Sequence, residues 1–341
     1  MEDRPSTAIS VCHPLPGLSE MITVTVVILN ALRSTLAGAA ITAAILGLAG
    51  GGAADPATAA TAATAGTGAP GVIHVVAAEN FWGNIASQLG GRDVDVTSLI
   101  TNPNADPHLF ETDAADAAKL AQAQIVIENG AGYDTWMSSL LGADSGHPRV
   151  VNAATVLHVR GSDPNPHLWY DIPRVPAVAA AITAALVQAA PRDAPTFRAN
   201  LAVFERSLAP LDATLATIRA RFHDVPVAYT ERVPGYALAV AHLDVKTPAG
   251  FARSIEDGVD PGPADTLAMQ QLLDDHDINV LLYNVQTVTP VTAQMRALAR
   301  HHGIPVVGVS ETMPAGAASY QQWQQSQLTN LLHALASSRN P

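Results

Sequence analysis

Two short segments of the sequence place a histidine directly after an Asx-Pro pair. They read Asp106-Pro107-His108-Leu109-Phe110 and Asn165-Pro166-His167-Leu168-Trp169, in stretches whose Asn, Asp and Pro content is typical of loops. Because proline fixes its own φ, the imidazole that follows has little further conformational entropy to lose on binding a ligand. Neutral imidazole is the commonest protein ligand for transition metals. One such histidine is most simply a turn residue, but the repeated motif favours His108 and His167 as metal ligands.

Glu231 is a third residue that could bind a cation. It follows an apolar, β-branched run at Val225–Thr230 that we predict to be a strand, and Arg232 comes directly after it. A carboxylate at a strand end in an apolar neighbourhood needs a partner of opposite charge. Arg232 or the N-terminus of the next helix could be that partner, and so could a cation bound across a cleft. The position alone favours neither interpretation.

Composition limits the classes of function. The chain has 18 Lys and Arg against 30 Asp and Glu, for a formal net charge of −12, and no segment gathers the basic residues into a stripe. A surface of this charge repels phosphate backbones, so we expect no nucleic acid as a partner. The only cysteine, Cys12, lies before the predicted fold, which excludes a disulfide framework and a thiolate metal site. A metal would therefore be held by nitrogen and oxygen ligands.

The N-terminal part of the chain has the pattern of a Sec-type signal peptide. Arg33 precedes an apolar run at Leu36–Leu48, and small residues follow. This run is shorter than the roughly 20 apolar residues that span a bilayer; an uncleaved anchor starting at Met21 is the alternative. We expect an upstream extension at 1–20, the signal peptide at 21–54 and a flexible Ala/Thr/Gly-rich tether at 55–71. The mature protein is then periplasmic, associated with the cell envelope or extracellular.

Lipidation is not expected at the end of this signal peptide. A bacterial lipoprotein would carry a cysteine after the Leu-Ala-Gly sequence, whereas Gly51 follows Leu48-Ala49-Gly50 here. The exported chain is therefore expected to be soluble, or to stay with the envelope through contacts that involve no lipid.

The rest of the chain alternates between strand-like and helical patterns. Such alternation at short intervals indicates parallel α/β sheets. Apolar residues from Phe197 to Ile218 recur at threes and fours and predict a long helix, or two helices around Pro210. The ligand of such a fold binds beyond the carboxyl ends of the strands, in the interlobe cleft. We therefore expect an α/β fold of two parallel-sheet lobes, at 72–192 and 223–341, joined by a long linking helix at 193–222. The predicted strands lie at 72–77, 94–100, 124–128 and near 149–151 in the first lobe, and at 225–230, 280–283 and 304–309 in the second.

Further segments give the chain a family resemblance from about Val72 to its end. Beside both histidine motifs, the markers are Ala78-Glu79-Asn80-Phe81-Trp82-Gly83, Ile127-Glu128-Asn129-Gly130-Ala131-Gly132-Tyr133, Tyr283-Asn284-Val285-Gln286-Thr287 before Pro290, and Ile304-Pro305-Val306-Val307. The sequence thereby resembles the metal-binding solute-binding proteins of zinc and manganese ABC importers, called cluster A-I. The resemblance implies two α/β lobes, a rigid linking helix and one divalent cation in the cleft, delivered to an ABC permease. We expect a monomer that is not an enzyme.

The resemblance also assigns ligands. His108 and His167 fall on the two histidine ligands of the first lobe, and Glu231 falls where members carry either His or Glu. Members often supply an Asp as fourth ligand from the late segment, but Asn284 to Pro290 contains no carboxylate. The fourth ligand therefore stays open, and the alternatives are Asp260, Asn284, Gln286 and a water molecule.

The ligand types narrow the choice of metal. Two imidazoles and a carboxylate suit tetrahedral zinc with one further ligand, and the same set with more oxygen donors suits manganese. We expect zinc (Zn2+) first and manganese (Mn2+) next. The alternative from another class is a secreted zinc hydrolase that uses the same His/His/Glu site, but no His-Glu-x-x-His helix or other base is visible beside either histidine. A carbohydrate or amino-acid carrier would need an aromatic-lined cleft, and the chain has only four Trp.

Overall fold

The structure of the protein is a computed structural model that describes residues 71–103, 107–143 and 146–338. The expected upstream extension at 1–20, the signal peptide at 21–54 and all but the last residue of the tether at 55–71 lie outside the described residues. These assignments stay predictions, and so do the domain limits at 72–192, 193–222 and 223–341.

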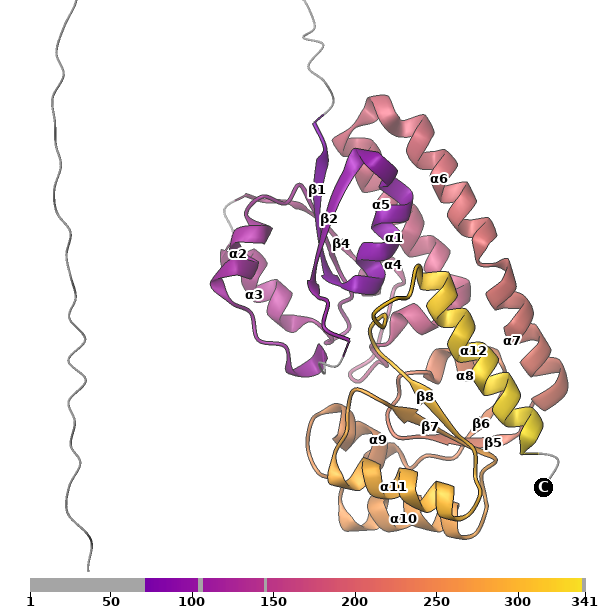
Figure 1. Ribbon diagram of the computed structural model, residues 1–341. Coiled ribbons are helices and arrows are strands. Elements are labelled where there is room, and N and C mark those ends of the chain that lie inside the picture. The colour runs from indigo at the N-terminus through magenta and orange to yellow at the C-terminus, as the bar shows by residue number, and fades with distance from the viewer. Residues whose placement is uncertain (1–70, 104–106, 144–145, 339–341) are drawn as a thin grey trace, which may run out of the picture. The chain divides into compact units, whose positions relative to one another are not determined.

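The N-terminal lobe is built around a four-stranded parallel sheet with the strand order β2-β1-β3-β4. Helices lie on both faces of this sheet (Figure 1), so β1 and β3 are buried almost throughout, which explains their continuous apolar sequences. The strands are β1 (Ile73–Glu79), β2 (Val94–Ile100), β3 (Ile125–Glu128) and β4 (Arg149–Asn152). The helices are α1 (Asn80–Gly90), α2 (Ala114–Leu120), α3 (Thr135–Ala143), α4 (Ala153–Val156) and α5 (Val175–Ala189).

Two successive helices, α6 (Ala194–Ser207) and α7 (Ala209–Phe222), connect the lobes along one side (Figure 1). α6 contacts α1 and α5 of the first lobe, whereas α7 contacts α8 and α12. The helix is interrupted at Leu208, two residues before Pro210. A proline has no N–H to donate, and its ring clashes with the carbonyl four residues earlier. Pro210 therefore explains why the linking segment forms two helices rather than one. The linking element of the expected fold is thus confirmed, in the form of two helices.

The C-terminal lobe repeats the architecture, with a parallel sheet of order β6-β5-β7-β8. Its strands are β5 (Pro226–Tyr229), β6 (Asp244–Val245), β7 (Val280–Asn284) and β8 (Val306–Val309). Its helices are α8 (Gly235–Val240), α9 (Ala249–Glu256), α10 (Pro263–Asp274), α11 (Pro290–His301) and α12 (Tyr320–Ser337). The α/β class with two parallel-sheet lobes is therefore confirmed.

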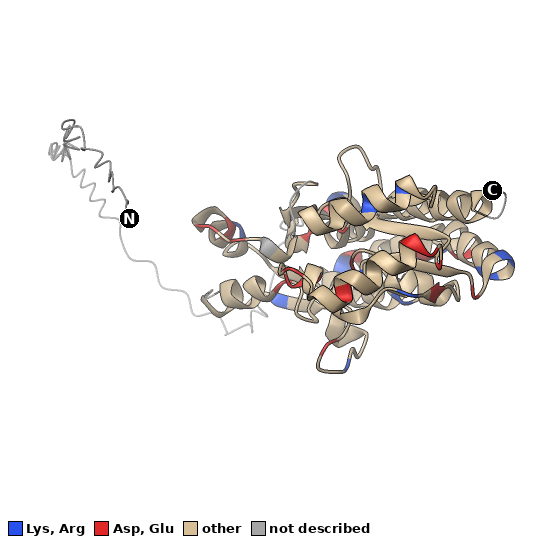
Figure 2. Ribbon diagram, turned by 90° about the horizontal axis from the view of Figure 1, so that it is seen from below, with Lys and Arg blue, Asp and Glu red and all other residues tan. Residues whose placement is uncertain are grey.

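One cluster of buried apolar side chains runs from the first sheet through the linking helices into the second sheet. The segment Ile172–Ala189, which includes α5, is long and apolar enough to cross a membrane by composition. Its residues Val175, Val178 and Ile182 are nevertheless part of this cluster, as in the core helix of a globular protein. The Lys and Arg positions are dispersed among acidic ones along the ribbon (Figure 2).

Candidate metal centre

Four side chains converge between the two sheets. His108, His167, Glu231 and Glu311 each offer one ligand atom, and these four atoms lie within 4.8 Å of one another. Nε2 of His108 is 3.7 Å from Oε1 of Glu231 and 3.4 Å from Oε2 of Glu311. Nε2 of His167 is 3.5 Å from the same Oε2 of Glu311. The structure thus brings together the three residues singled out in the sequence and adds Glu311, which sequence reasoning missed.

The parallel topology of both sheets explains why these residues meet. Glu231 follows β5 and Glu311 follows β8, so both glutamates lie beyond the carboxyl ends of strands in the second lobe. His108 lies in a 3₁₀ turn, Pro107–Leu109, after β2, and His167 directly precedes another such turn, Leu168–Tyr170. Parallel sheets gather all their carboxyl ends at one edge, where ligands bind. Glu311 could have been found from sequence by this rule, since it stands two residues after a predicted strand.

Asn165 fixes the orientation of His167. Its Oδ1 lies 2.7 Å from Nδ1 of the imidazole and accepts the backbone N–H of His167 at 3.1 Å. An amide oxygen only accepts, so Nδ1 carries a proton, and in the neutral ring Nε2 is then the nitrogen that presents its lone pair to the centre. Asn165 is itself held by donating to the carbonyl of Arg232 at 2.8 Å. The Asx of this Asx-Pro-His motif therefore selects the tautomer that can bind a cation.

Asn284 and Gln286, two of the alternatives for the fourth ligand, position the glutamates: Asn284 bonds their carboxylates, and Gln286 bonds the backbone of Glu311. Nδ2 of Asn284 donates to Oε2 of Glu231 at 2.6 Å and to Oε1 of Glu311 at 2.7 Å. Oε1 of Gln286 accepts the backbone N–H groups of Glu311 and Thr312. The third alternative, Asp260, is exposed and is not a member of the cluster that the described residues form.

Burial and charge define the electrostatics of the centre. His167 and Glu311 are fully buried and Glu231 is 1% exposed. Burial by itself raises the pKa of Glu311, but the neighbouring His108 and His167 and the bond from Asn284 outweigh it and leave the pKa at about 2. Glu311 is therefore an anion at neutral pH. Two carboxylates beside two imidazoles, shielded from water, are a favourable arrangement only when positive charge lies between them.

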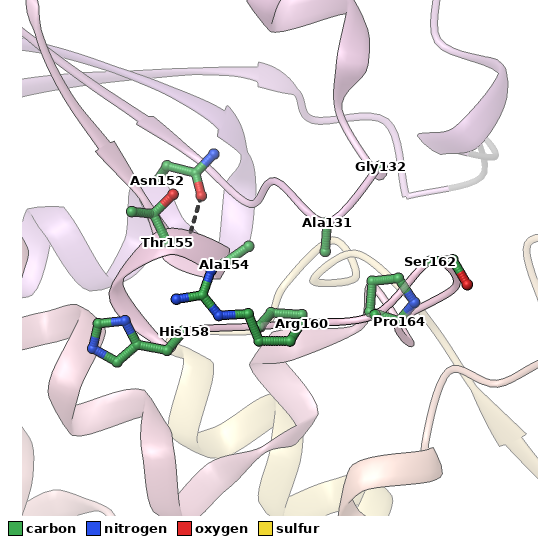
Figure 3. Close-up of a pocket in the computed structure, with 11 residues that line it drawn as sticks. Ala131, Gly132, Asn152, Ala154, Thr155, His158, Arg160, Ser162 and Pro164 are labelled. Carbon is green, nitrogen blue, oxygen red and sulfur yellow. Dashed lines mark hydrogen bonds between the residues drawn. The ribbon is translucent and has the colours of Figure 1, made fainter.

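Arg232 does not use its charge at this centre. Its guanidinium pairs with Glu256 at 2.6 Å and with Asp163 at 3.0 Å, near the mouth of the cleft. A small cavity of about 170 Å³ lies there, and its lining includes His108 and Arg232 from opposite lobes. A larger pocket of about 560 Å³ shares the lining residues Ala131, Gly132, Ser162 and Pro164 with it (Figure 3). His108, the one partly exposed member of the cluster, is the side chain that faces this opening.

Fold and centre together define a two-lobed binding protein whose ligand site lies between two parallel sheets. The chain belongs to the zinc-uptake complex component A periplasmic family, ZnuA, whose profile matches residues 75–334. The expected family is thereby confirmed. It consists of metal-binding transport proteins rather than enzymes, so the alternative of a secreted zinc hydrolase has no support.

Curated relatives share a part of the chain. The manganese-binding lipoprotein MntA of Bacillus subtilis is 29% identical over 147 residues, which are 41% of this chain and 48% of MntA. The iron-binding protein YfeA of Yersinia pestis is 28% identical over 149 residues, 42% of this chain and 47% of YfeA. The match thus spans about half the length of these relatives.

Solved structures match this chain over almost their own whole length. The periplasmic zinc-binding protein TroA of Treponema pallidum superimposes with a TM-score of 0.67 at 17% identity, over 78% of this chain and 99% of TroA. FpvC of Pseudomonas aeruginosa, solved with Ni2+, gives a TM-score of 0.66 at 19% identity, over 78% of this chain and 97% of FpvC. At these identities the likeness establishes the fold.

Proposed function

We propose that this protein captures a divalent transition-metal ion outside the cytoplasm and delivers it to an ABC permease. The observation that carries the proposal is the convergence of His108, His167, Glu231 and Glu311 between the two lobes, with their ligand atoms within 4.8 Å of one another. Two imidazoles and two carboxylates, shielded from water, form a donor set for a borderline cation and provide the negative charge that neutralises it.

The transported ion in this proposal is zinc, with manganese as the second choice. The names of the similar proteins do not select between them, because MntA is called manganese-binding, YfeA iron-binding and TroA zinc-binding. The donor set supports zinc as the first choice. Two nitrogen and two oxygen ligands suit tetrahedral zinc, whereas manganese favours six oxygen donors and binds a given nitrogen-containing site less tightly.

We further propose export through the signal peptide at 21–54 and a monomeric mature protein. MntA and the substrate-binding protein SsaB of Streptococcus sanguinis are named lipoproteins. The present chain has Gly51 where the lipidated cysteine would stand after Leu48-Ala49-Gly50, so we propose that it carries no lipid there. Metabolic labelling with a fatty acid is the test, and a labelled protein would contradict this part of the proposal.

The experiment that tests the function is elemental analysis of the protein purified from the exported fraction, followed by calorimetry with zinc and with manganese. One equivalent of zinc should be bound, more tightly than manganese. The His333→Ala variant, which removes an exposed histidine from α12, is the matched control and should bind like the wild type. Absence of tight binding of either metal to the wild type would overturn the proposal.

A further inference from the structure

The side-chain amide of Asn284 lies between the two carboxylates of the centre. Its Nδ2 donates to Oε2 of Glu231 at 2.6 Å and to Oε1 of Glu311 at 2.7 Å. The other two carboxylate oxygens, Oε1 of Glu231 and Oε2 of Glu311, are the ones that approach the imidazoles. One amide group thus engages one oxygen of each glutamate and leaves the other to face the cluster.

The surrounding hydrogen bonds determine which way this amide points. Oδ1 of Asn284 accepts the backbone N–H of Gln286 at 3.0 Å, a contact that an NH₂ group could not make. On the other side, ionised carboxylates can only accept, so they require the NH₂ group. Nδ2 also lies 2.9 Å from Oγ1 of Thr287, but the two shorter contacts, both to charged acceptors, are the stronger ones.

Asn284 is also held firmly at its backbone. It is the last residue of β7, is 1% exposed, and donates its backbone N–H to Oγ1 of Thr230 at 3.0 Å. Thr230 in turn directly precedes Glu231 in the chain. The amide, both carboxylates and the strand ends therefore form one packed unit. A carboxylate that turned to offer both oxygens to a metal would lose its charge-assisted bond to Asn284, whose released N–H would have only the neutral hydroxyl of Thr287 as acceptor.

We propose that Asn284 is a positioning residue that sets the metal preference of the centre. By holding one oxygen of each glutamate, it restricts Glu231 and Glu311 to a single ligand atom each, which gives a four-coordinate site of two nitrogens and two oxygens. Zinc adopts this geometry readily, whereas manganese, which favours six ligands rich in oxygen, loses the chelating oxygens it would use. The inference rests on the proposed function, because it concerns the choice among metals at the same site.

The test compares the wild type with Asn284→Leu, which keeps the approximate volume of the side chain and removes its N–H groups. Zinc and manganese affinities are measured by calorimetry, and Co2+ is used as a spectroscopic probe of coordination number. The wild type should give the intense visible bands of tetrahedral Co2+. The variant should give weaker bands of higher coordination, and its ratio of zinc to manganese affinity should fall by about tenfold, since one bond to a charged group is lost at each carboxylate. Asn330→Leu, the same change at an exposed position of α12, should leave spectrum and ratio unchanged.

The outcomes separate this inference from the proposed function. If the wild type binds neither metal, the proposed function fails. If Asn284→Leu weakens zinc and manganese equally and the Co2+ spectrum is unaltered, Asn284 only supports the fold and the inference is overturned. If the variant does not fold, the wild type decides: a six-coordinate Co2+ spectrum would contradict the inference, and a tetrahedral one would support it.

Discussion

The hydroxyl of Tyr133 donates a 2.9 Å hydrogen bond to Oε2 of Glu311, across the cleft between the lobes. Tyr133 lies in the loop after β3, and its ring also meets the His108 imidazole edge-on, with ring centroids 4.8 Å apart. Burial, and then the charge of Glu311, raise the pKa of Tyr133 well above its ordinary value. The phenol therefore keeps its proton and remains a donor to the ligand oxygen at any physiological pH.

Tyr133→Phe should lower the stability of the metal-free protein. The substitution removes a hydrogen bond to a buried charged acceptor, which is worth about 1.5–3 kcal/mol. Bound zinc would neutralise the charge on the same oxygen, Oε2 of Glu311. The difference in stability between variant and wild type should therefore be smaller in the zinc-loaded protein. Tyr283→Phe is the control, because the hydroxyl of Tyr283 is buried with no hydrogen-bond partner among the described residues. Denaturant unfolding with and without zinc checks this, and equal losses for both variants would contradict the role of Tyr133.

The sequence was sufficient to predict most of the fold because its signals are local. The predicted strand at 94–100 coincides with β2, and the other six predicted strands overlap β1, β3, β4, β5, β7 and β8. Buried parallel strands are continuous apolar runs, which makes them visible. β6, Asp244–Val245, was missed because two residues with one apolar side chain carry no periodicity. Its pairing with β5 is a tertiary effect.

The candidate site was predictable only in part. His108 and His167 belong to a repeated motif and Glu231 ends a strand, so each carries a signal of its own. Glu311 has the same strand-end signal after β8, but it lies outside the late segment, Asn284 to Pro290, from which the resemblance implies a carboxylate ligand. The roles of Asn284 and Tyr133 depend on partners 53 and 178 residues away in the chain, and no local pattern indicates such contacts.

His108→Ala and His167→Ala should each abolish most metal binding. Either variant leaves one imidazole and two carboxylates, which do not complete a tetrahedral zinc shell with protein ligands. Changes in the outer partners of metal ligands typically lower affinity by about 10- to 100-fold, so the loss of a ligand itself should exceed that range. Calorimetry with zinc measures the effect. Wild-type affinity in either variant would remove that histidine from the centre.

Glu311→Gln distinguishes the fourth ligand suggested by the geometry from the alternatives left open by the sequence. Glutamine keeps the size of the side chain but removes its charge and replaces one oxygen by a donor that cannot bind a cation. Zinc affinity should fall by at least about 100-fold on the same reasoning. Asp260→Asn, at an exposed position of the second lobe, should bind zinc like the wild type. The opposite pattern in calorimetry would make Asp260 the ligand.

Asp134 should make stability depend on pH. It is 3% exposed, and burial raises its pKa from 3.8 to about 6 although it accepts the N–H groups of Asn129 and Gly130. The folded protein thus holds this proton more tightly than the unfolded chain. The resulting stabilisation is present below about pH 4 and is lost as the pH rises through about 6, a difference of roughly 3 kcal/mol.

Asp134→Asn removes this titration. Metal-free wild type should therefore lose stability relative to the variant between about pH 4 and pH 7, as measured by denaturant unfolding at each pH. The charge of Glu128 also raises the pKa of Asp134 and is present in both proteins, so only the difference between wild type and variant is diagnostic. A difference that stays constant with pH would show that Asp134 does not titrate in this range.

Protons and metal should compete for the centre. Bound imidazoles must be neutral, so metal binding displaces any protons that His108 and His167 carry. Protons and zinc compete for the same two imidazoles, so the apparent zinc affinity should fall as the pH is lowered, with a slope of up to two protons per ion. Because the histidines and the glutamates come from opposite lobes, the ion should also tie the lobes together, and zinc should raise the melting temperature by mass action.

A Glu231→Gln variant should keep the pH dependence of zinc affinity, which comes from the histidines. It should lose much of the gain in melting temperature, since its contact to the ion is weakened. The measurement is a thermal melt of both proteins with and without zinc at about pH 7.5 and about pH 5.5. Zinc should stabilise the wild type strongly at the higher pH and weakly at the lower one. Equal stabilisation at both, or none at either, would contradict the assignment of these residues to one metal centre.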